Sequence, residues 1–164
     1  MSEPKPVTIY TRGIATPGGG AYGALLVCDG RRKELSGGEV AASNNRMDVL
    51  AAVESLKALK RACQVTLYNT NGYLIDAMSK GWAARWREAG WITGEGKPTA
   101  HADLWDALLE LCAVHEVKFV WLPDEGIDEY AQCHQLARQV IQEQVRRVAE
   151  GRAEADAAAS RPGE

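Results

Sequence analysis

The chain has 164 residues, which is the size of one domain and enough to bury a hydrophobic core. Apolar residues make up 46% and charged residues 25%, a balance that ordinary globular proteins share. The net charge is -3, whereas a protein that binds a polyanion usually carries a clear surplus of lysine and arginine. Any binding to nucleic acid must therefore come from a local basic patch or be weak.

The four cysteines are scattered along the sequence, with no C-x-x-C spacing among them. This spacing argues against a zinc site. The first residues are polar and include proline, and no apolar run reaches the length of a membrane span. We therefore expect a reduced, cytoplasmic protein that has no membrane partner.

The first part of the chain predicts three antiparallel strands. Residues 7–10 alternate between polar and apolar positions, and residues 21–28 form an apolar run after the glycine-rich turn at 16–20. Asp29-Gly30 is typical of a hairpin turn and leads into a third predicted strand at 31–37. Consecutive hairpins of this kind favour antiparallel pairing.

The hydrophobic period then changes from that of a strand to that of a helix. From 44 to 62 apolar residues recur at intervals of three and four, and Ser43 or Asn44 could cap the helix. The remaining predicted elements are a strand at 65–68, a helix at 73–80, an aromatic-rich stretch at 82–91, a helix at 104–113, a strand at 117–122 and a helix from 128 onward.

This order of elements predicts one α/β domain built on a five-stranded mixed sheet, with the first three strands antiparallel and helices on the faces. We expect a flexible leader at 1–6, the domain at 7–150 with an extended C-terminal helix, and a flexible tail at 151–164. The tail is rich in alanine, glutamate and arginine and can bury little apolar surface.

Several segments resemble the type 1 ribonuclease H family. Ser43-Asn44-Asn45-Arg46-Met47, followed by the acidic Asp48, resembles the family's T-N-N-R-M-E segment at the start of its first helix. Residues 21–26 resemble its second-strand G-Y-G-A-x-L segment. Further similarity lies in the spacing of Trp82, Trp86 and Trp91, in Lys97-Pro98, in Asp103-Leu104-Trp105 and in Cys133-x-x-Leu136-Ala137-Arg138. The resemblance spans 7–138 and implies the ribonuclease H-like fold.

The resemblance also implies four site positions. In that family four carboxylates bind two magnesium ions, which activate a water molecule and stabilise the leaving oxygen. The matching positions of this chain hold Arg12, Asp48, Thr70 and His134, so one carboxylate of four remains. The stretch that matches the family's mobile histidine loop, 123–126, contains no histidine.

These replacements predict that the metal site is lost. Arg12 puts a permanent cation where a divalent ion would lie, and magnesium prefers several hard oxygen ligands. We therefore expect no catalytic residue, no bound metal and no cofactor. We also expect the guanidinium of Arg12 to pair with the carboxylate of Asp48 and to fill the former metal volume.

The resemblance places nucleic-acid contacts at positions that this chain partly keeps. They are Gly13, Asn44, Asn45, Trp82, Trp86, Arg85 and Arg87. The segment 82–105, the tryptophan protrusion, holds three basic and three acidic residues, so it has no net basic charge. A structural role competes with binding at two places: the asparagines can serve helix capping, and tryptophans at such spacing more often pack than stack on bases.

Three functions are compatible with these observations. The first is a catalytically inactive ribonuclease H homologue that binds an RNA/DNA hybrid or duplex weakly and with strong salt sensitivity. The second is a protein-interaction or oligomerisation module that uses the C-terminal helix, which the neutral protrusion and the negative net charge favour. The third is a divergent, metal-dependent hybrid ribonuclease with residual activity that relies on Asp48. We expect the first.

Overall fold

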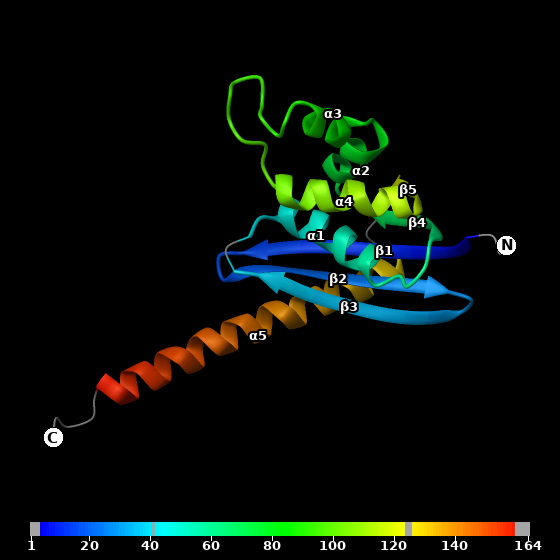
Figure 1. Cartoon of the computed structure of the whole chain (residues 1–164). Helices are drawn as coiled ribbons and strands as arrows, with labels where there is room; N and C mark the ends of the chain where they lie inside the picture. Colours follow the sequence, from blue (N-terminus) through cyan, green and yellow to red (C-terminus); the bar gives the residue numbers. More distant parts are fainter. Residues whose placement is uncertain (1–3, 41, 124–125, 160–164) are drawn as a thin grey trace.

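The computed structural model describes residues 4–40, 42–123 and 126–159, and Figure 1 shows it as a sheet with helices on two sides. The strands are β1 (Lys5–Thr16), β2 (Gly19–Cys28), β3 (Arg31–Glu39), β4 (Cys63–Asn69) and β5 (Glu116–Trp121). The helices are α1 (Asn44–Lys57), α2 (Gly72–Ser79), α3 (Trp82–Glu88), α4 (Ala102–Val114) and α5 (Asp128–Ala159).

The five strands form one mixed sheet in the order β3-β2-β1-β4-β5. β1 pairs antiparallel with β2, and β2 pairs antiparallel with β3, because two short hairpin turns connect them. β4 pairs parallel with β1 and with β5, because helices connect these strands across the sheet. The predicted ribonuclease H-like sheet, with its first three strands antiparallel, is confirmed.

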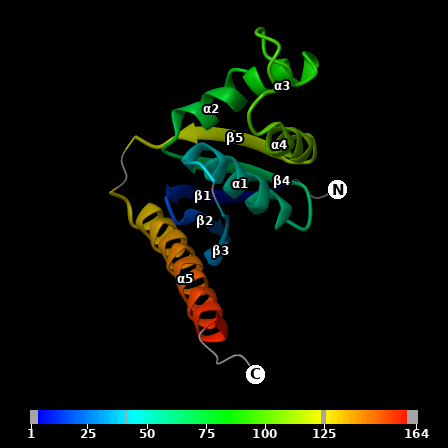
Figure 2. The same cartoon turned by 90° about the vertical axis from the view of Figure 1, so that its left-hand side faces the viewer.

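The main core lies between one face of the sheet and the helices α1, α2 and α4, whereas α5 covers the other face (Figures 1 and 2). Because β2 is covered on both faces, its first eight residues are all buried, and the strand therefore consists of small and apolar residues. Trp105 of α4 is completely buried in the main core. This packing fixes the ends of β1, β4 and α1 relative to one another.

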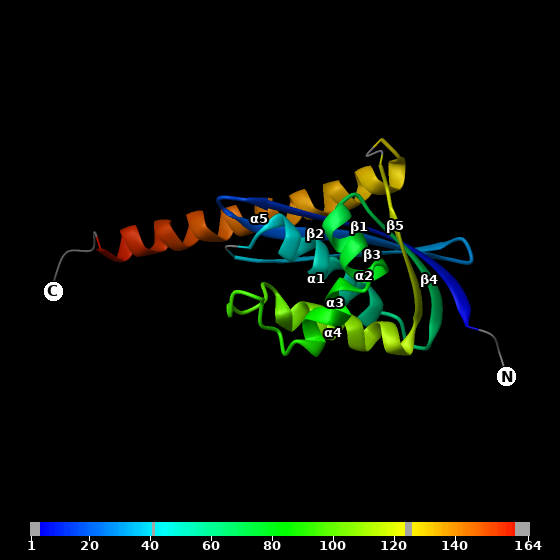
Figure 3. The same ribbon diagram turned by 90° about the horizontal axis from the view of Figure 1, so that it is seen from above.

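Helix α5 runs along the sheet and then continues past its edge (Figure 3). The side chain of Gln144 still reaches the sheet, where its Nε2 donates to the backbone carbonyl of Gly20 at 3.0 Å. Residues 150–159 are helical with exposed side chains. The part of the predicted tail at 151–159 is therefore helical, because alanine, glutamate and arginine favour helix without needing burial. The division of the chain into leader, domain and tail stays a prediction.

β1 begins at Lys5, inside the predicted leader, while residues 1–3 and 160–164 lie outside the described residues. Within the described ranges, no helix has the combination of length and apolar character that crossing a membrane requires.

Candidate functional site

Asp48 lies near the start of α1, where this helix meets β1. Ser43 caps the helix by accepting a hydrogen bond from the backbone N–H of Arg46 at 3.1 Å. The backbone N–H of Gly13 donates to Oδ1 of Asp48 at 2.7 Å. A Cβ atom on Gly13 would lie 2.5 Å from the backbone nitrogen of Asp48, so only glycine permits this close approach of strand and helix.

Asp48 is 5% exposed, and two asparagine side chains donate hydrogen bonds to its carboxylate. Nδ2 of Asn69 donates to Oδ1 of Asp48 at 3.1 Å, and Nδ2 of Asn71 donates to Oδ2 at 2.8 Å. The two amides are linked in turn, because the backbone N–H of Asn71 donates to Oδ1 of Asn69 at 2.7 Å. The Nδ2 group of Asn69 also contacts Thr11, a buried residue of β1, at 3.0 Å. We call Gly13, Asp48, Asn69, Asn71 and Thr11 the Asp48 network.

The environment of Asp48 acts on its pKa in two opposing directions. Burial removes water from the carboxylate and raises the pKa above its ordinary value of 3.8. The hydrogen bonds from Asn71, Asn69 and Gly13 and the positive charge of Arg12 lower it, and burial wins. Asp48 is therefore a carboxylate whose charged form is costly and is stabilised mainly by neutral donors.

The expected ion pair between Arg12 and Asp48 is wrong in its direct form. Among the described residues the guanidinium of Arg12 instead lies 4.9 Å from the ring centroid of Tyr130, in a cation–π arrangement. Arg12 does act on Asp48 through its charge, because this positive charge lowers the pKa of the carboxylate. The physical reason is that amide groups already occupy both oxygens of Asp48, while a planar aromatic ring is available to Arg12.

Tyr130 of α5 connects the other family positions. The hydroxyl groups of Thr70 and Tyr130 are 2.5 Å apart, and either can be the donor. His134 follows Tyr130 by four residues on α5, so the two side chains share one face of the helix. Arg12 and Thr70 thus both contact Tyr130, which is 1% exposed, and His134 lies one helical turn further along α5. Sequence reasoning missed Tyr130, because its burial depends on how α5 docks on the sheet.

The donor set around Asp48 fits a magnesium ion poorly as it is arranged here. Both carboxylate oxygens of Asp48 accept hydrogen bonds from amide groups, and the hydroxyl of Thr70 is engaged with Tyr130. Among the described residues, no three histidine, cysteine or acidic side chains gather as ligands of one ion. Magnesium takes several hard oxygen ligands in octahedral geometry. A single buried carboxylate supplies neither the charge nor the number of ligands.

The two asparagines at the start of α1 differ in their surroundings. Both side chains are exposed. Oδ1 of Asn45 accepts a hydrogen bond from Nδ2 of Asn71 at 2.8 Å, which ties Asn45 to the Asp48 network. Ser43, and not Asn44, supplies the helix cap. Asn44 therefore presents a polar amide beside Asp48 that the helix cap does not use.

The tryptophan protrusion packs mainly through Trp86. Its ring stacks on Tyr73 of α2 with centroids 6.0 Å apart, and it meets Trp105 edge-on at 5.5 Å. Trp82 lies beside Lys80, whose Nζ is 5.5 Å from the ring centroid. These contacts give Trp86 a packing role that fixes α3 to α2 and α4.

The two arginines of α3 also differ. Arg87 forms an ion pair with Glu110 of α4 at 2.8 Å and lies 3.6 Å from Asp106. Arg85 is exposed and donates to the backbone carbonyl of Lys80 at 3.3 Å. Of the two, Arg85 is therefore the one whose charge is less neutralised by acidic neighbours within the described residues.

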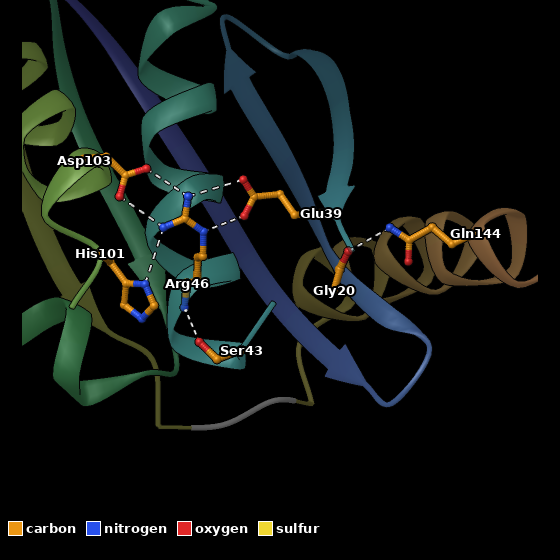
Figure 4. Close-up of polar contacts among 7 residues, drawn as sticks. All are labelled: Gly20, Glu39, Ser43, Arg46, His101, Asp103 and Gln144. Carbon is orange, nitrogen blue, oxygen red and sulfur yellow. Dashed lines mark hydrogen bonds and ion pairs between the residues drawn. The ribbon is translucent and has the colours of Figure 1, made fainter. Parts of the chain in front are cut away.

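Arg46 holds the base of the tryptophan protrusion against the sheet (Figure 4). Its guanidinium pairs with Glu39 of β3 at 2.6 Å and with Asp103 of α4 at 2.9 Å, and it lies 3.5 Å from the ring nitrogen of His101. The hydrogen bonds that Arg46 donates, together with its positive charge, lower the pKa of Asp103. Sequence reasoning included Arg46 only as part of a motif, because its partner Asp103 lies 57 residues away in the chain and nothing in the sequence pairs the two.

Comparisons with known proteins place this geometry in a family. The sequence model described as RNase H matches residues 4–142. A protein named Ribonuclease H from Syntrophus aciditrophicus is 49% identical over 72% of this chain and 69% of its own length. One named Ribonuclease HI from Synechocystis is 41% identical over 92% of this chain and 96% of its own length. Another protein named Ribonuclease H, from Rippkaea orientalis, is 44% identical over 86% of this chain and 88% of its own length.

Solved structures show the same fold at lower identity. The structure of LC9-RNase H1, described as a type 1 RNase H with the type 2 active-site motif, superposes with a TM-score of 0.74 at 20% identity. It covers 88% of this chain and 75% of that one. The structure of LC11-RNase H1 in complex with RNA/DNA hybrid superposes with a TM-score of 0.65 at 19% identity, over 85% and 99% of the two chains.

These relatives correct two expectations drawn from the sequence. We expected a catalytically inactive homologue that uses no cofactor. Relatives that share 41% to 49% of their residues with this chain carry the name of the enzyme, which contradicts both expectations. We had inferred inactivity from the replaced carboxylates alone, and that inference went further than four positions allow. The chain nevertheless holds Arg12, Thr70 and His134 where the resemblance implies carboxylates.

The family match covers most of the chain, the relatives exceed 40% identity over most of its length, and the fold superposes on a solved ribonuclease H structure with a TM-score of 0.74. This chain belongs to the ribonuclease H family.

Proposed function

We propose that this protein is a ribonuclease that binds an RNA/DNA hybrid and hydrolyses its RNA strand. The observation that carries the proposal is the identity of 41% to 49% with proteins named for that enzyme, over most of the chain. A solved structure of the same fold contains an RNA/DNA hybrid, which supports nucleic acid as the partner. A cytoplasmic location stays part of the proposal.

The binding surface in this proposal is the end of the sheet where α1 begins. Asn44 and Asn45 are exposed there, next to Gly13 and Asp48. Neutral amide groups can donate to phosphate and sugar oxygens, and such contacts position a duplex without reading its sequence. Arg85 on the tryptophan protrusion adds one cation. Because few cations are involved, we expect weak binding at this surface, with a shallower dependence on salt than the strong one expected from the sequence.

Asp48 is the carboxylate that the proposal assigns to hydrolysis. It is the one acidic side chain among the four family positions, and it lies beside the exposed asparagines. Of the three groups that donate to its oxygens, the side-chain amide of the half-buried Asn71 can rotate when a substrate or an ion competes for the carboxylate, whereas Asn69 is completely buried and Gly13 donates from the backbone. Because the donors around Asp48 fit magnesium poorly, we assign no step of the reaction to a metal ion.

A cleavage assay on a labelled RNA/DNA hybrid tests the proposal. We expect the wild-type protein to cut the RNA strand, and we expect Asp48→Asn to lose at least about a hundredfold in rate, as removal of one charged group from an active site commonly does. Asp156→Asn makes the same chemical change on the exposed end of α5 and serves as the matched control. The assay is run in magnesium and in manganese, with hybrid binding measured in parallel.

Two outcomes would overturn the proposal. The first is a wild-type protein that binds the hybrid but leaves its RNA strand intact in both metal ions. The second is cleavage that Asp48→Asn does not reduce, which would remove Asp48 from the reaction and point to a contaminating nuclease or to another site.

One observation favours a second function, the interaction of this protein with another protein or with its own copy through α5. Val145 and Val148 on this helix are each 52% exposed. Apolar side chains on a helix that continues past the sheet are a common means of association. Sedimentation of the wild type and of the Val148→Glu variant tests this function, and a wild type that remains monomeric at high concentration would contradict association with its own copy.

A further inference from the structure

A groove of about 760 Å³ lies at the opposite end of the sheet from the exposed start of α1. It is formed where the start of β1, the hairpin between β2 and β3, and the connection from α1 to β4 meet, at the right-hand end of Figure 1. We call it the basic groove. Its lining includes Lys5, Arg31, Arg32, Lys33, Lys60 and Arg61, together with the apolar or small residues Val7, Leu26, Cys28, Ala58, Leu59 and Cys63.

The strand register explains why the cations of β3 gather there. Arg31 is opposite Cys28 and Lys33 is opposite Leu26, so both point to the face of the sheet that α1 covers. Arg32 lies between them and points to the other face, where it pairs with Glu129 of α5 at 3.7 Å. Arg31 and Lys33 therefore form one rim of the groove.

The second rim comes from the connection between α1 and β4. Lys60 and Arg61 are exposed and lie in the connection that follows the end of α1 at Lys57. They stand across the groove from the β3 rim, although nearly thirty residues separate the two segments in sequence. Each rim thus presents two cations, with half-buried and buried apolar residues such as Leu59 and Leu26 between them.

The positive charge of the groove is poorly neutralised. Asp29 is the one acidic residue in the lining, and its carboxylate pairs with Lys5 at 2.8 Å. Within the part of the chain that the structure describes, no acidic side chain forms an ion pair with Arg31, Lys33, Lys60 or Arg61. In a protein with a net charge of -3, four such cations around one hollow are a local concentration of charge.

We propose that the basic groove binds the sugar-phosphate backbone of a nucleic acid, as a second contact surface separate from the end of the sheet that contains Asp48. A backbone carries one negative charge for about every 3.4 Å of each strand along the axis, so cations on two rims can contact successive phosphates. The groove extends the proposed function and does not depend on it, because phosphate binding requires no cleavage.

The shape of the groove favours nucleic acid over a membrane surface. The cations stand on the rims of a concave surface, and its apolar residues form the floor. A membrane would be contacted by a flat or convex surface with large apolar side chains at its outermost points. None of the large apolar side chains that are exposed in the described part of the chain lines this groove.

The position of the groove gives the proposal a geometric consequence. Helix α1 has 14 residues and is therefore about 21 Å long, and it separates Asn44 at one end from Lys60 just beyond the other. A nucleic acid held in the groove thus has its contacts roughly 20 Å from the asparagines at the start of α1. Because the cations contact phosphates and not bases or sugars, duplex DNA and hybrid should bind to the groove alike.

The test measures the binding of fluorescent duplex DNA by anisotropy over a series of salt concentrations. Duplex DNA is used because it reports on the groove whether or not the protein cuts hybrids. The variant Arg31→Gln/Arg61→Gln removes one cation from each rim. The matched control Arg146→Gln/Arg147→Gln removes two arginines from the exposed face of α5, where both are near Glu143.

We expect the groove variant to lose two phosphate contacts and its salt slope to fall by about 1.8. The loss of affinity between about 50 and about 200 mM salt should then be about tenfold smaller than for the wild type. The control should bind as the wild type does. Equal melting temperatures of all three proteins would show that the changes act on binding and not on folding.

Three results would overturn the proposal. One is a groove variant that binds duplex DNA as tightly as the wild type does and has the same salt slope. A second is an equal loss in the control variant, which would indicate a general effect of charge. The third is a groove variant that keeps its DNA binding but no longer binds vesicles containing phosphatidylserine, which would assign the groove to a lipid surface.

Discussion

The two ends of the sheet use polar residues in opposite ways. At the end with the Asp48 network, polar side chains are buried and bind one another: Asn69 is completely buried, and both oxygens of Asp48 accept hydrogen bonds. At the end with the basic groove, cations such as Arg31 and Lys60 are exposed, and the described acidic residues do not pair with them. Polar residues alone therefore do not define a binding surface, since burial and pairing decide whether a group remains available to a partner.

The largest expected effect lies in the contact between β1 and α1. Gly13→Ala would bring a methyl group within 2.7 Å of three atoms of Met47 and Asp48, most of them backbone. The strand and the helix must then separate, and we expect a loss of about 3 kcal/mol in the free energy of unfolding. Urea denaturation measures this loss, with Gly94→Ala as the control, because nothing lies within 4 Å of a Cβ at Gly94. Equal midpoints of the two variants would show that the network end tolerates movement.

Arg46 provides the next largest effect. Arg46→Ala removes the ion pairs with Glu39 and Asp103 and leaves two carboxylates facing one another, so we expect a loss of about 1 to 2 kcal/mol in stability. Arg46→Lys keeps the charge but cannot bind two carboxylates with a planar group, and it should fall between the wild type and the alanine variant. Thermal denaturation at low and high salt checks the order. A loss that salt does not reduce would point to packing and not to charge.

The charge of Asp48 should be visible in the pH dependence of stability. Because burial raises its pKa above 3.8, the folded protein holds this proton more tightly than the unfolded chain does. The resulting stabilisation is complete below the ordinary pKa and is lost as the pH rises through the raised pKa. We therefore expect Asp48→Asn to gain melting temperature relative to the wild type as the pH increases across that window. A difference that stays constant with pH would mean that the hydrogen bonds and Arg12 cancel the effect of burial, and the opposite trend would mean that they outweigh it.

The smallest expected effect on stability lies at the groove. Arg31 and Arg61 are exposed and form no ion pair with a described acidic residue, so Arg31→Gln/Arg61→Gln should change the free energy of unfolding by less than about 0.5 kcal/mol. Urea denaturation of this variant and of Gly13→Ala compares the stability losses at the two ends of the sheet directly. A large loss in the groove variant would contradict the contrast between a buried network and an available surface.

Local signals in the sequence predicted the elements well. Asp29-Gly30 predicted the hairpin between β2 and β3, and Ser43 was one of two predicted caps for α1. The helix at 44–62 was predicted too long, because α1 ends at Lys57 and the chain must turn before β4 begins at Cys63. Hydrophobic period describes which face of a segment is buried, and it does not show where a strand of the sheet requires the chain to turn.

The candidate site was less predictable, because it depends on contacts between distant segments. The resemblance pointed to Asp48 and its neighbours. It could not show that Asn69 and Asn71 donate hydrogen bonds to the carboxylate, or that the guanidinium of Arg12 stacks over the ring of Tyr130. The basic groove was hidden for the same reason. Its two rims are short charged segments that resemble ordinary solvated residues until the register of β2 and β3 brings them together.

The extension of α5 has a consequence for how the molecule exchanges its amide hydrogens. The side-chain contacts of this helix with the sheet reach as far as Gln144 and Val145, whereas residues 150–159 are exposed. An isolated helix of that length is marginally stable in water. Amide hydrogens within this one helix should therefore exchange at two different rates. Exchange should be slow near Cys133, where opening requires the fold to unfold, and fast beyond residue 150, where the last turns open alone. The residue at which exchange changes from slow to fast would mark the end of the cooperatively folded unit within a single helix.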